Sequence, residues 1–226
     1  MQIKLSVYLG KKTVTGYNII NLADVIKLKK NGTQEAETAY DKIMSAISAF
    51  ECNLNDDVEH FLRHKAVIFA EQGIAATFLV FTSYKNEPVL VGYFTLANKT
   101  LVIPKKKIDF KTLQKRIAKF GEYNPDLRNY QLSIPLIAQL GKNFSQGFNS
   151  LITGDELLKL ACYKIADIQL MLSGKMTYVE CEEKKSLINF YTSNGFIRIA
   201  NRKLDSVEKK EGEPAYLVQL IKYIKK

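Results

Sequence analysis

A change of hydrophobic pattern at Gly73 constrains the fold of this chain more than any other feature of its sequence. Two runs rich in aromatic and β-branched residues follow it, IAATFLVF at 74–81 and VLVGYFTL at 89–96, on either side of a turn at Asn86-Glu87-Pro88. Such a pair is typical of a β-hairpin. Both runs are apolar along most of their length, so we expect both strands to be largely buried.

Helical patterns flank this hairpin. Apolar residues recur at intervals of three and four over 35–50 and again over 58–69, where Asn55 or Asp56 can cap the helix and Gly73 ends it. Strands that alternate with helices after an early hairpin predict an α/β (α+β) fold, with a mixed central sheet and helices on both faces. The further elements expected are strands at 132–140, 176–182, 195–200 and 215–224 and helices at 154–174 and 184–194.

Pro135 lies within the run LSIPLIAQL at 132–140. Proline has no backbone N–H to donate to a strand ladder. We therefore expect this strand to lie at a sheet edge or to carry a bulge.

Length and composition limit the class of protein. The 226 residues, 46% of them hydrophobic, suit one domain over 1–226 that buries a sizeable core. No run approaches the roughly 18 apolar residues of a membrane span, and the N-terminus shows no charged leader or cleavage site, so we expect a cytoplasmic protein without membrane segments. Cys52, Cys162 and Cys181 are too scattered for a disulfide framework and are expected to be reduced and mostly buried.

Positive charge is concentrated in one segment. The formal net charge is +10, and 104–128 holds eight Lys and Arg against three Asp and Glu, which gives 8 − 3 = +5. We interpret 104–128 as a basic insertion with a short helix around 110–120, ended by Gly121. Polyanions or anionic cofactors are plausible partners, and a solvated lysine face is the alternative.

Several catalytic motifs are absent. The chain has no P-loop, no G-x-G-x-x-G after a strand and no G-x-S-x-G elbow. His60 and His64 are spaced i, i+4 on an expected helix, but the intervening residues lack the glutamate of a zinc protease and no Cys or carboxylate cluster completes a ligand set. We therefore predict no metal site.

The segment 132–158 is more informative, because it reads as strand, irregular loop and helix start. Thr153 and Glu156 fit the capping box T-x-x-E at the first turn. A helix that starts after such a loop presents its amides and the positive end of its dipole, which suits a pyrophosphate. The alternative is an ordinary helix start in which Asp155 and Glu156 complement the dipole and would repel a phosphate.

Together with the expected strand 176–182 and helix 184–194 that follow it, this segment resembles the GNAT acyltransferase superfamily. The residues NFYTSNGF at 189–196 look like that family's closing motif, F-Y-x-x-x-G-F. The stretches FECN at 50–53, 58–62, TFLV at 77–80 and VGYFTL at 91–96 are similar in order and spacing to the GNAT branch that contains acetyltransferase toxins acting on charged tRNA. The resemblance implies a single acetyltransferase-like domain with a splayed mixed sheet that binds acetyl-CoA (CoA).

The same resemblance implies the cofactor-binding residues. The strand before the phosphate loop would pair with the pantetheine arm, the loop and helix start would hold the pyrophosphate, and the last helix would add one contact. These positions are Gln139, Leu140, Gly141, Lys142, Ser150, Leu151, Ile152, Thr153, Gly154, Asp155 and Asn189. The family's Q/R-x-x-G-x-G/A loop is reduced here to its last glycine, Gly154, so a degenerate protein that binds CoA poorly is an alternative.

The implied reaction is direct attack of a primary amine on the acetyl thioester. The Leu140 amide would polarise the thioester carbonyl, Tyr191 would protonate the leaving thiolate, and Glu180 or Glu182 would take a proton from the amine. A core tyrosine and solvent-facing glutamates are the structural alternatives.

The acceptor is not specified by a motif. Lys105, Lys106 and Lys107 favour an anionic acceptor such as aminoacyl-tRNA or another anionic carrier, and dimers are common in the family. A cofactor-free basic module that holds RNA through these lysines and nearby aromatics is the competing class of function.

Overall fold

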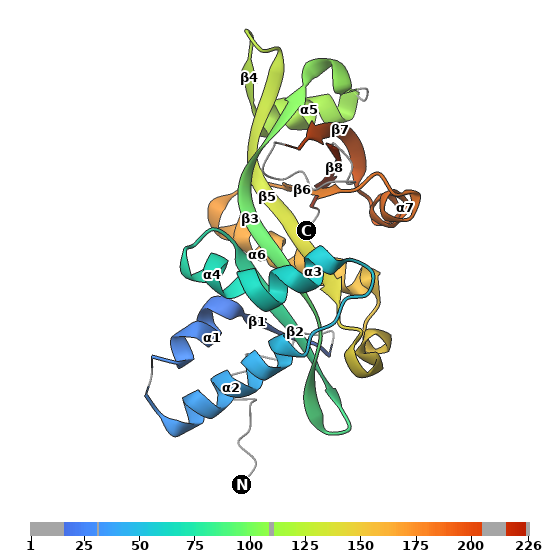
Figure 1. The fold of residues 1–226 in the computed structure, drawn as a ribbon. Coiled ribbons are helices and arrows are strands. Elements are labelled where there is room, and N and C mark those ends of the chain that lie inside the picture. Colours follow the sequence, from blue (N-terminus) through green and yellow to red (C-terminus); the bar gives the residue numbers. More distant parts are fainter. Residues whose placement is uncertain (1–15, 31, 109–110, 205–215, 225–226) are drawn as a thin grey trace. The chain divides into compact units, whose positions relative to one another are not determined.

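The computed structural model describes residues 16–30, 32–108, 111–204 and 216–224, and Figure 1 shows its elements. The strands are β1 (Asn18–Asn21), β2 (Ala76–Tyr84), β3 (Glu87–Pro104), β4 (Glu122–Asn124), β5 (Asn129–Lys142), β6 (Met176–Cys181), β7 (Ile197–Lys203) and β8 (Tyr216–Tyr223). The helices are α1 (Leu22–Leu28), α2 (Gln34–Ser48), α3 (Asp56–His60), α4 (Ala66–Glu71), α5 (Lys111–Phe120), α6 (Gly154–Leu172) and α7 (Lys185–Ser193).

The strands form an open mixed sheet, which confirms the expected fold class. Their order within the described chain is β1-β2-β3-β5-β6-β8-β7, and β4 pairs with β5. The β5–β6 pair is parallel, whereas the β1–β2, β2–β3, β4–β5, β6–β8 and β7–β8 pairs are antiparallel. None of the described helices is both long and apolar enough to cross a membrane.

Two compact units make up the chain, and each is described by itself. Unit 1 comprises Met1–Ala97 and Gln139–Leu160, and unit 2 comprises Asn98–Ala138 and Ala161–Lys226. Three elements, β3, β5 and α6, contribute residues to both. The single domain over 1–226 with an insertion at 104–128 stays a prediction.

In unit 1, the hairpin β2–β3 is confirmed, with both strands mostly buried. Its turn lies at Lys85 and Asn86, which have φ of 49° and 68°, and β3 already begins at Glu87. Two adjacent residues with positive φ match the twist of a two-residue hairpin turn, so the strands extend further than the turn predicted at 86–88.

Helices cover both faces of β3 in unit 1. A Cβ added to Gly92 would lie 3.2 Å from the Leu157 side chain of α6. The next residue, Tyr93, donates a hydrogen bond from its hydroxyl to the carbonyl of Val58 in α3. Because successive strand residues point to opposite faces, α6 and α3 lie on opposite sides of β3. The predicted helix over 58–69 is interrupted by a π-helical turn, Phe61–Lys65, and Asn55 is its N-cap.

In unit 2, β5 and β6 pair over a short register, Leu136 with Tyr178 and Ile137 with Val179. The strand β5 itself continues to Lys142. The β5–β6 pairing therefore ends well before β5 itself ends, which agrees with the expected splayed sheet. Of the two alternatives for Pro135, the edge strand is wrong, because β5 lies between β3 and β6, and the bulge stays a prediction. The proline directly precedes the parallel register, and its carbonyl accepts a hydrogen bond of 2.8 Å from the Thr177 hydroxyl.

The basic segment 104–128 lies in unit 2, and its predicted helix is α5, which buries Leu113 and Ile117. The helix ends at Gly121, as expected. A Cβ added there would lie 2.8 Å from the Leu132 side chain, so glycine lets α5 end directly against β5. The short strand β4 that follows carried no strand signal in the sequence. It pairs with β5 through Tyr123 and Tyr130.

Candidate active site

The predicted pantetheine strand is the last part of β5, in unit 1. Gln139, Leu140 and Lys142 are half-buried there and Gly141 is buried. A Cβ on Gly141 would lie only 2.3 Å from Cγ1 of Val58, and a Cβ on Gly92 would lie 2.8 Å from the Gly141 carbonyl oxygen. Both glycines are therefore required by close packing between β5, β3 and α3. The sequence did not single out Gly92, because a strand glycine has many explanations.

Asn143 fixes the direction of the chain as it leaves β5. Its side chain is 3% exposed and donates to the Leu90 carbonyl at 2.8 Å. Its Oδ1 accepts from the backbone N–H groups of Glu51 and Ser145, each at 3.1 Å. Its own N–H donates to the Val91 carbonyl at 2.8 Å. One asparagine thus ties the start of the loop to β3 and to the segment before α3. Nothing in the sequence pattern identified it.

The loop that follows contains 3₁₀ turns over Ser145–Leu151. Gln146 and Gly147 adopt left-handed backbone conformations, with φ of 52° and 75°. The Ser150 hydroxyl donates to the Gly147 carbonyl at 2.8 Å, and the Tyr17 hydroxyl donates to the Leu151 carbonyl at 2.9 Å. The loop is therefore fixed both by a hydrogen bond within it and by one from Tyr17, which is another residue that the sequence did not single out.

The capping box at the start of α6 is present as predicted. The Thr153 N–H and hydroxyl both donate to Oε2 of Glu156 at 2.8 Å, and the Glu156 N–H donates to the Thr153 hydroxyl oxygen at 3.1 Å. These hydrogen bonds, followed by one from Tyr17 and by the positive charge of Lys142, hold the pKa of Glu156 below its ordinary value. The same hydrogen bonds hold the Glu156 carboxylate against the N-cap, whereas the side chain of Asp155 is exposed.

The other residues predicted for the phosphate site follow this geometry. Ile152 is buried, Leu151 and Gly154 are half-buried, and Ser150 and Thr153 are exposed. Unit 1 thus brings together the predicted residues from 139 to 155 in one continuous strand, loop and helix start.

Tyr191 belongs to α7 in unit 2. It is 9% exposed, and its ring makes edge contacts with Phe190 and Phe196 at centroid distances of 5.0 and 5.6 Å. Burial, with a smaller contribution from Cys181, raises the pKa of Tyr191 well above its ordinary value. The phenol therefore stays protonated through the neutral pH range. Asn189, on the same helix, is exposed.

The two predicted glutamates differ in their surroundings. Glu180 lies in β6, and its two oxygens accept from Nε of Arg202 at 2.9 Å and from Nε2 of Gln219 at 2.8 Å. Glu182 lies just past the end of β6, not within a strand as expected, and pairs with Lys184 at 2.6 Å. Glu180 is thus held in a fixed network, whereas Glu182 makes a surface ion pair.

The predicted acceptor lysines, 105–107, form an exposed 3₁₀ turn in unit 2. Lys105 lies over the Tyr123 ring at 5.3 Å from its centroid. The described residues contain no group of three or more His, Cys, Asp and Glu that could hold a metal ion. All three cysteines are buried free thiols, as expected.

No protein-family model matches this chain, and no curated protein matches it either. Solved structures do. A Tyr-to-Phe mutant of KacT is 17% identical, with a TM-score of 0.52 over 77% of this chain and 86% of that one. A bacterial toxin is 16% identical, with a TM-score of 0.51 over 77% of this chain and 81% of that one. AtaT complexed with acetyl-methionyl-tRNAfMet is 20% identical, with a TM-score of 0.48 over 76% of this chain and 85% of that one.

The neighbours are GNAT-fold acetyltransferase toxins. The chain has a GNAT fold. The match to KacT carries this conclusion, and at 17% identity it shows the fold alone.

Proposed function

We propose that this protein is an acetyl-CoA-dependent N-acetyltransferase. The observation that carries the proposal is the continuous β5 end, fixed loop and capped α6 start in unit 1, within a GNAT fold. The chain continues five residues past the last β5–β6 pair at Ile137, which leaves backbone groups of 138–142 for a partner other than β6. An extended amide-containing arm is chemically suited to them.

The residues at the start of α6 fit the anionic part of CoA. Lys142 supplies a positive charge, which is a minor cause of the lowered pKa of Glu156 after the Thr153 hydrogen bonds. The Glu156 carboxylate already accepts two hydrogen bonds from Thr153, so it is directed toward the helix cap and not toward a bound phosphate. The half-buried Gly154 permits close approach to the first-turn amides. Asp155 opposes phosphate binding, which favours modest affinity.

Acetyl-CoA, when bound, supplies an acetyl thioester that a primary amine can attack. The Leu140 N–H would donate to the oxygen on which negative charge develops. Tyr191 Oη holds a proton through the neutral range and would donate it to a leaving sulfur. Of the two candidate bases, we favour Glu182, because both oxygens of Glu180 are held by Arg202 and Gln219.

For the acceptor, we propose an amine carried on an anionic molecule such as aminoacyl-tRNA. The exposed lysines 105–107 and the +5 charge of 104–128 support this choice. A small cationic amine would be repelled by the same charges. Homodimer formation stays a prediction.

A thermal melt with CoA tests the cofactor assignment. A ligand that binds only the folded state adds roughly 2.7 kcal/mol to the free energy of unfolding at a hundred times its Kd. We expect a clear upward shift in Tm, abolished by Gly154→Glu, which adds bulk and negative charge. Gly154→Ala adds bulk without charge, so it should reduce the shift less than Gly154→Glu does. No shift at millimolar CoA would overturn the cofactor assignment, and salt-sensitive stabilisation by RNA alone would then favour the RNA-binding module.

A further inference from the structure

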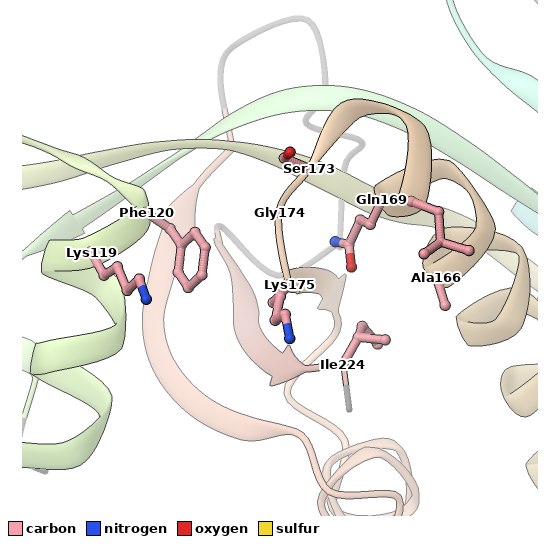
Figure 2. Close-up of a pocket in the computed structure, with 9 residues that line it drawn as sticks. Lys119, Phe120, Ala166, Gln169, Ser173, Gly174, Lys175 and Ile224 are labelled. Carbon is pink, nitrogen blue, oxygen red and sulfur yellow. The ribbon is translucent and has the colours of Figure 1, made fainter. Parts of the chain in front are cut away.

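Unit 2 contains a cavity of about 340 Å³ that the proposed acetyl transfer does not use. It is formed by the end of α5, the end of α6, the turn 173–175 and Ile224. Figure 2 shows Lys119 and Phe120 on one side of it and Gln169 and Ala166 on the other. This volume lies at the lower end of the range of small-molecule sites, about 300–1,000 Å³.

The charged residues that line the cavity are all positive. Two lysines, Lys119 and Lys175, border the cavity, and no Asp or Glu is among its nine lining residues. Lys119 places its Nζ 5.9 Å from the centroid of the Phe120 ring. Both lysines are exposed, so their ammonium groups can reach an anion without first losing a buried partner. The cavity is therefore suited to a negatively charged group.

The remaining lining supplies a flat apolar contact and a fixed amide. The Phe120 ring is half-buried and lies 6.5 Å from the Tyr223 ring, centroid to centroid. Ala166, Leu170 and Ile224 add aliphatic surface, and Leu170 is 61% exposed, which a bound ring would reduce. Nε2 of Gln169 donates to the Met176 carbonyl at 2.8 Å, which holds the amide in place. An aromatic ring could stack here with its polar edge toward Gln169.

We infer that this cavity binds one nucleoside monophosphate, with the base against Phe120 and the phosphate at Lys119 and Lys175. Its volume suits one nucleotide better than two. The nucleotide can be free in solution or part of a single strand, since the recognised chemistry is the same. All lining residues belong to unit 2 and none is predicted to hold CoA, so this site is independent of the proposed function.

Titration of the full chain with AMP, followed by NMR of the ligand, tests the site. We expect saturable binding with upfield shifts of the adenine protons, because they would lie over the Phe120 ring. Adenosine and inorganic phosphate should each bind more weakly than AMP. Phe120→Leu should weaken binding by at least about five-fold, the lower end of what one base stack contributes. Lys175→Gln removes an exposed charge from the phosphate contact and should weaken binding by about two-fold or more. Lys111→Gln, with the same charge change at the other end of α5, should leave binding unchanged.

Lys175→Gln changes an exposed side chain, so it keeps the test valid even if Phe120→Leu disturbs folding. Absence of saturable AMP binding at millimolar concentration, or equal binding by parent and Lys175→Gln, would overturn the inference. A short adenylate strand that binds more tightly than AMP, and loses affinity in the same variants, would identify a strand as the source; equal affinity would identify the free nucleotide. The Gly154→Glu variant should still bind AMP, which separates this site from the CoA site.

Discussion

The side-chain amide of Asn143 donates a hydrogen bond to the backbone carbonyl of Leu90, at 2.8 Å and across 53 residues of sequence. The Oδ1 of the same side chain accepts from Glu51, which is 92 residues away, and from Ser145. The buried carboxamide therefore connects β3, the segment before α3 and the loop that leads to α6. The position of the proposed phosphate loop depends on this junction.

Replacement of Asn143 by Ala should destabilise the protein strongly. The variant leaves the Leu90 carbonyl and the Ser145 N–H buried without this partner, and each such group costs about 1–3 kcal/mol. The Glu51 N–H, which is only partly buried, also loses its partner. We expect a loss of about 2 kcal/mol or more in the free energy of unfolding, measured by urea denaturation. Asn149→Ala, in the same loop, is the control and should change it by less than about 0.5 kcal/mol. Equal stability of the two variants would show that the junction is not important.

Gly141 should not tolerate a side chain while Val58 is present. A Cβ at Gly141 would lie 2.3 Å from Cγ1 of Val58, so we expect Gly141→Ala to cost about 1–3 kcal/mol through overpacking. Val58→Ala removes the clashing methyl. In the double variant, the cost of Gly141→Ala should fall, giving a favourable coupling energy of about 0.5 kcal/mol or more in a double-mutant cycle. Strict additivity would argue against this contact.

Glu156 should contribute stability that disappears in acid. Its pKa is lowered in the folded state by the Thr153 hydrogen bonds, so the contribution is complete above the ordinary Glu pKa of about 4.3 and is lost as pH falls through the folded-state value. We expect parent and Glu156→Gln to differ most near neutral pH and to converge in acid. Denaturation curves from about pH 6 to about pH 3 measure this. A constant difference across that range would contradict the assignment.

Tyr191→Phe should preserve the fold and slow acetyl transfer. The ring contacts with Phe190 and Phe196 persist, whereas the proton donor is lost, and a positioned acid typically contributes about 10²- to 10⁴-fold in rate. The rate of acetyl transfer is measured from the release of free thiol from acetyl-CoA. Tyr178→Phe removes the same atom from another buried tyrosine and should leave the rate unchanged. If Tyr191→Phe is as fast as the parent across pH, Tyr191 acts only in packing.

The lysines 105–107 should control the salt dependence of acceptor binding. Each phosphate contact to a single strand contributes about 0.7 to the slope of log affinity against log salt. Replacing all three by Ser should weaken acceptor binding and flatten that slope, with CoA affinity unchanged. The control variant makes the same change in charge at three exposed lysines of unit 1, by replacing Lys30, Lys42 and Lys65 with Ser. If both triple variants behave alike, lysines 105–107 form only a solvated face.

Features whose partners lie close in sequence were predictable. The Thr153–Glu156 capping box and the Asn55 N-cap each depend on contacts within a few residues, so a short motif contains the whole interaction. The hairpin was also predictable, because runs of aromatic and β-branched residues and the turn between them are local features of the sequence. Its turn was placed too late by one or two residues, since positive φ at Lys85 leaves no distinctive sequence signal.

The sequence by itself determined the order of the strands and helices other than β1, α1 and β4, the aromatic hairpin, the capped start of α6 and the resemblance to GNAT proteins. Only the tertiary structure decided that Pro135 lies in an internal strand, that Arg202 and Gln219 hold Glu180, and that Asn143 and Tyr17 brace the loop. The physical reason is distance along the chain: Tyr17 meets the Leu151 carbonyl across 134 residues. A hydrogen bond across that interval exists only where tertiary packing brings the two segments together, so no local pattern encodes it.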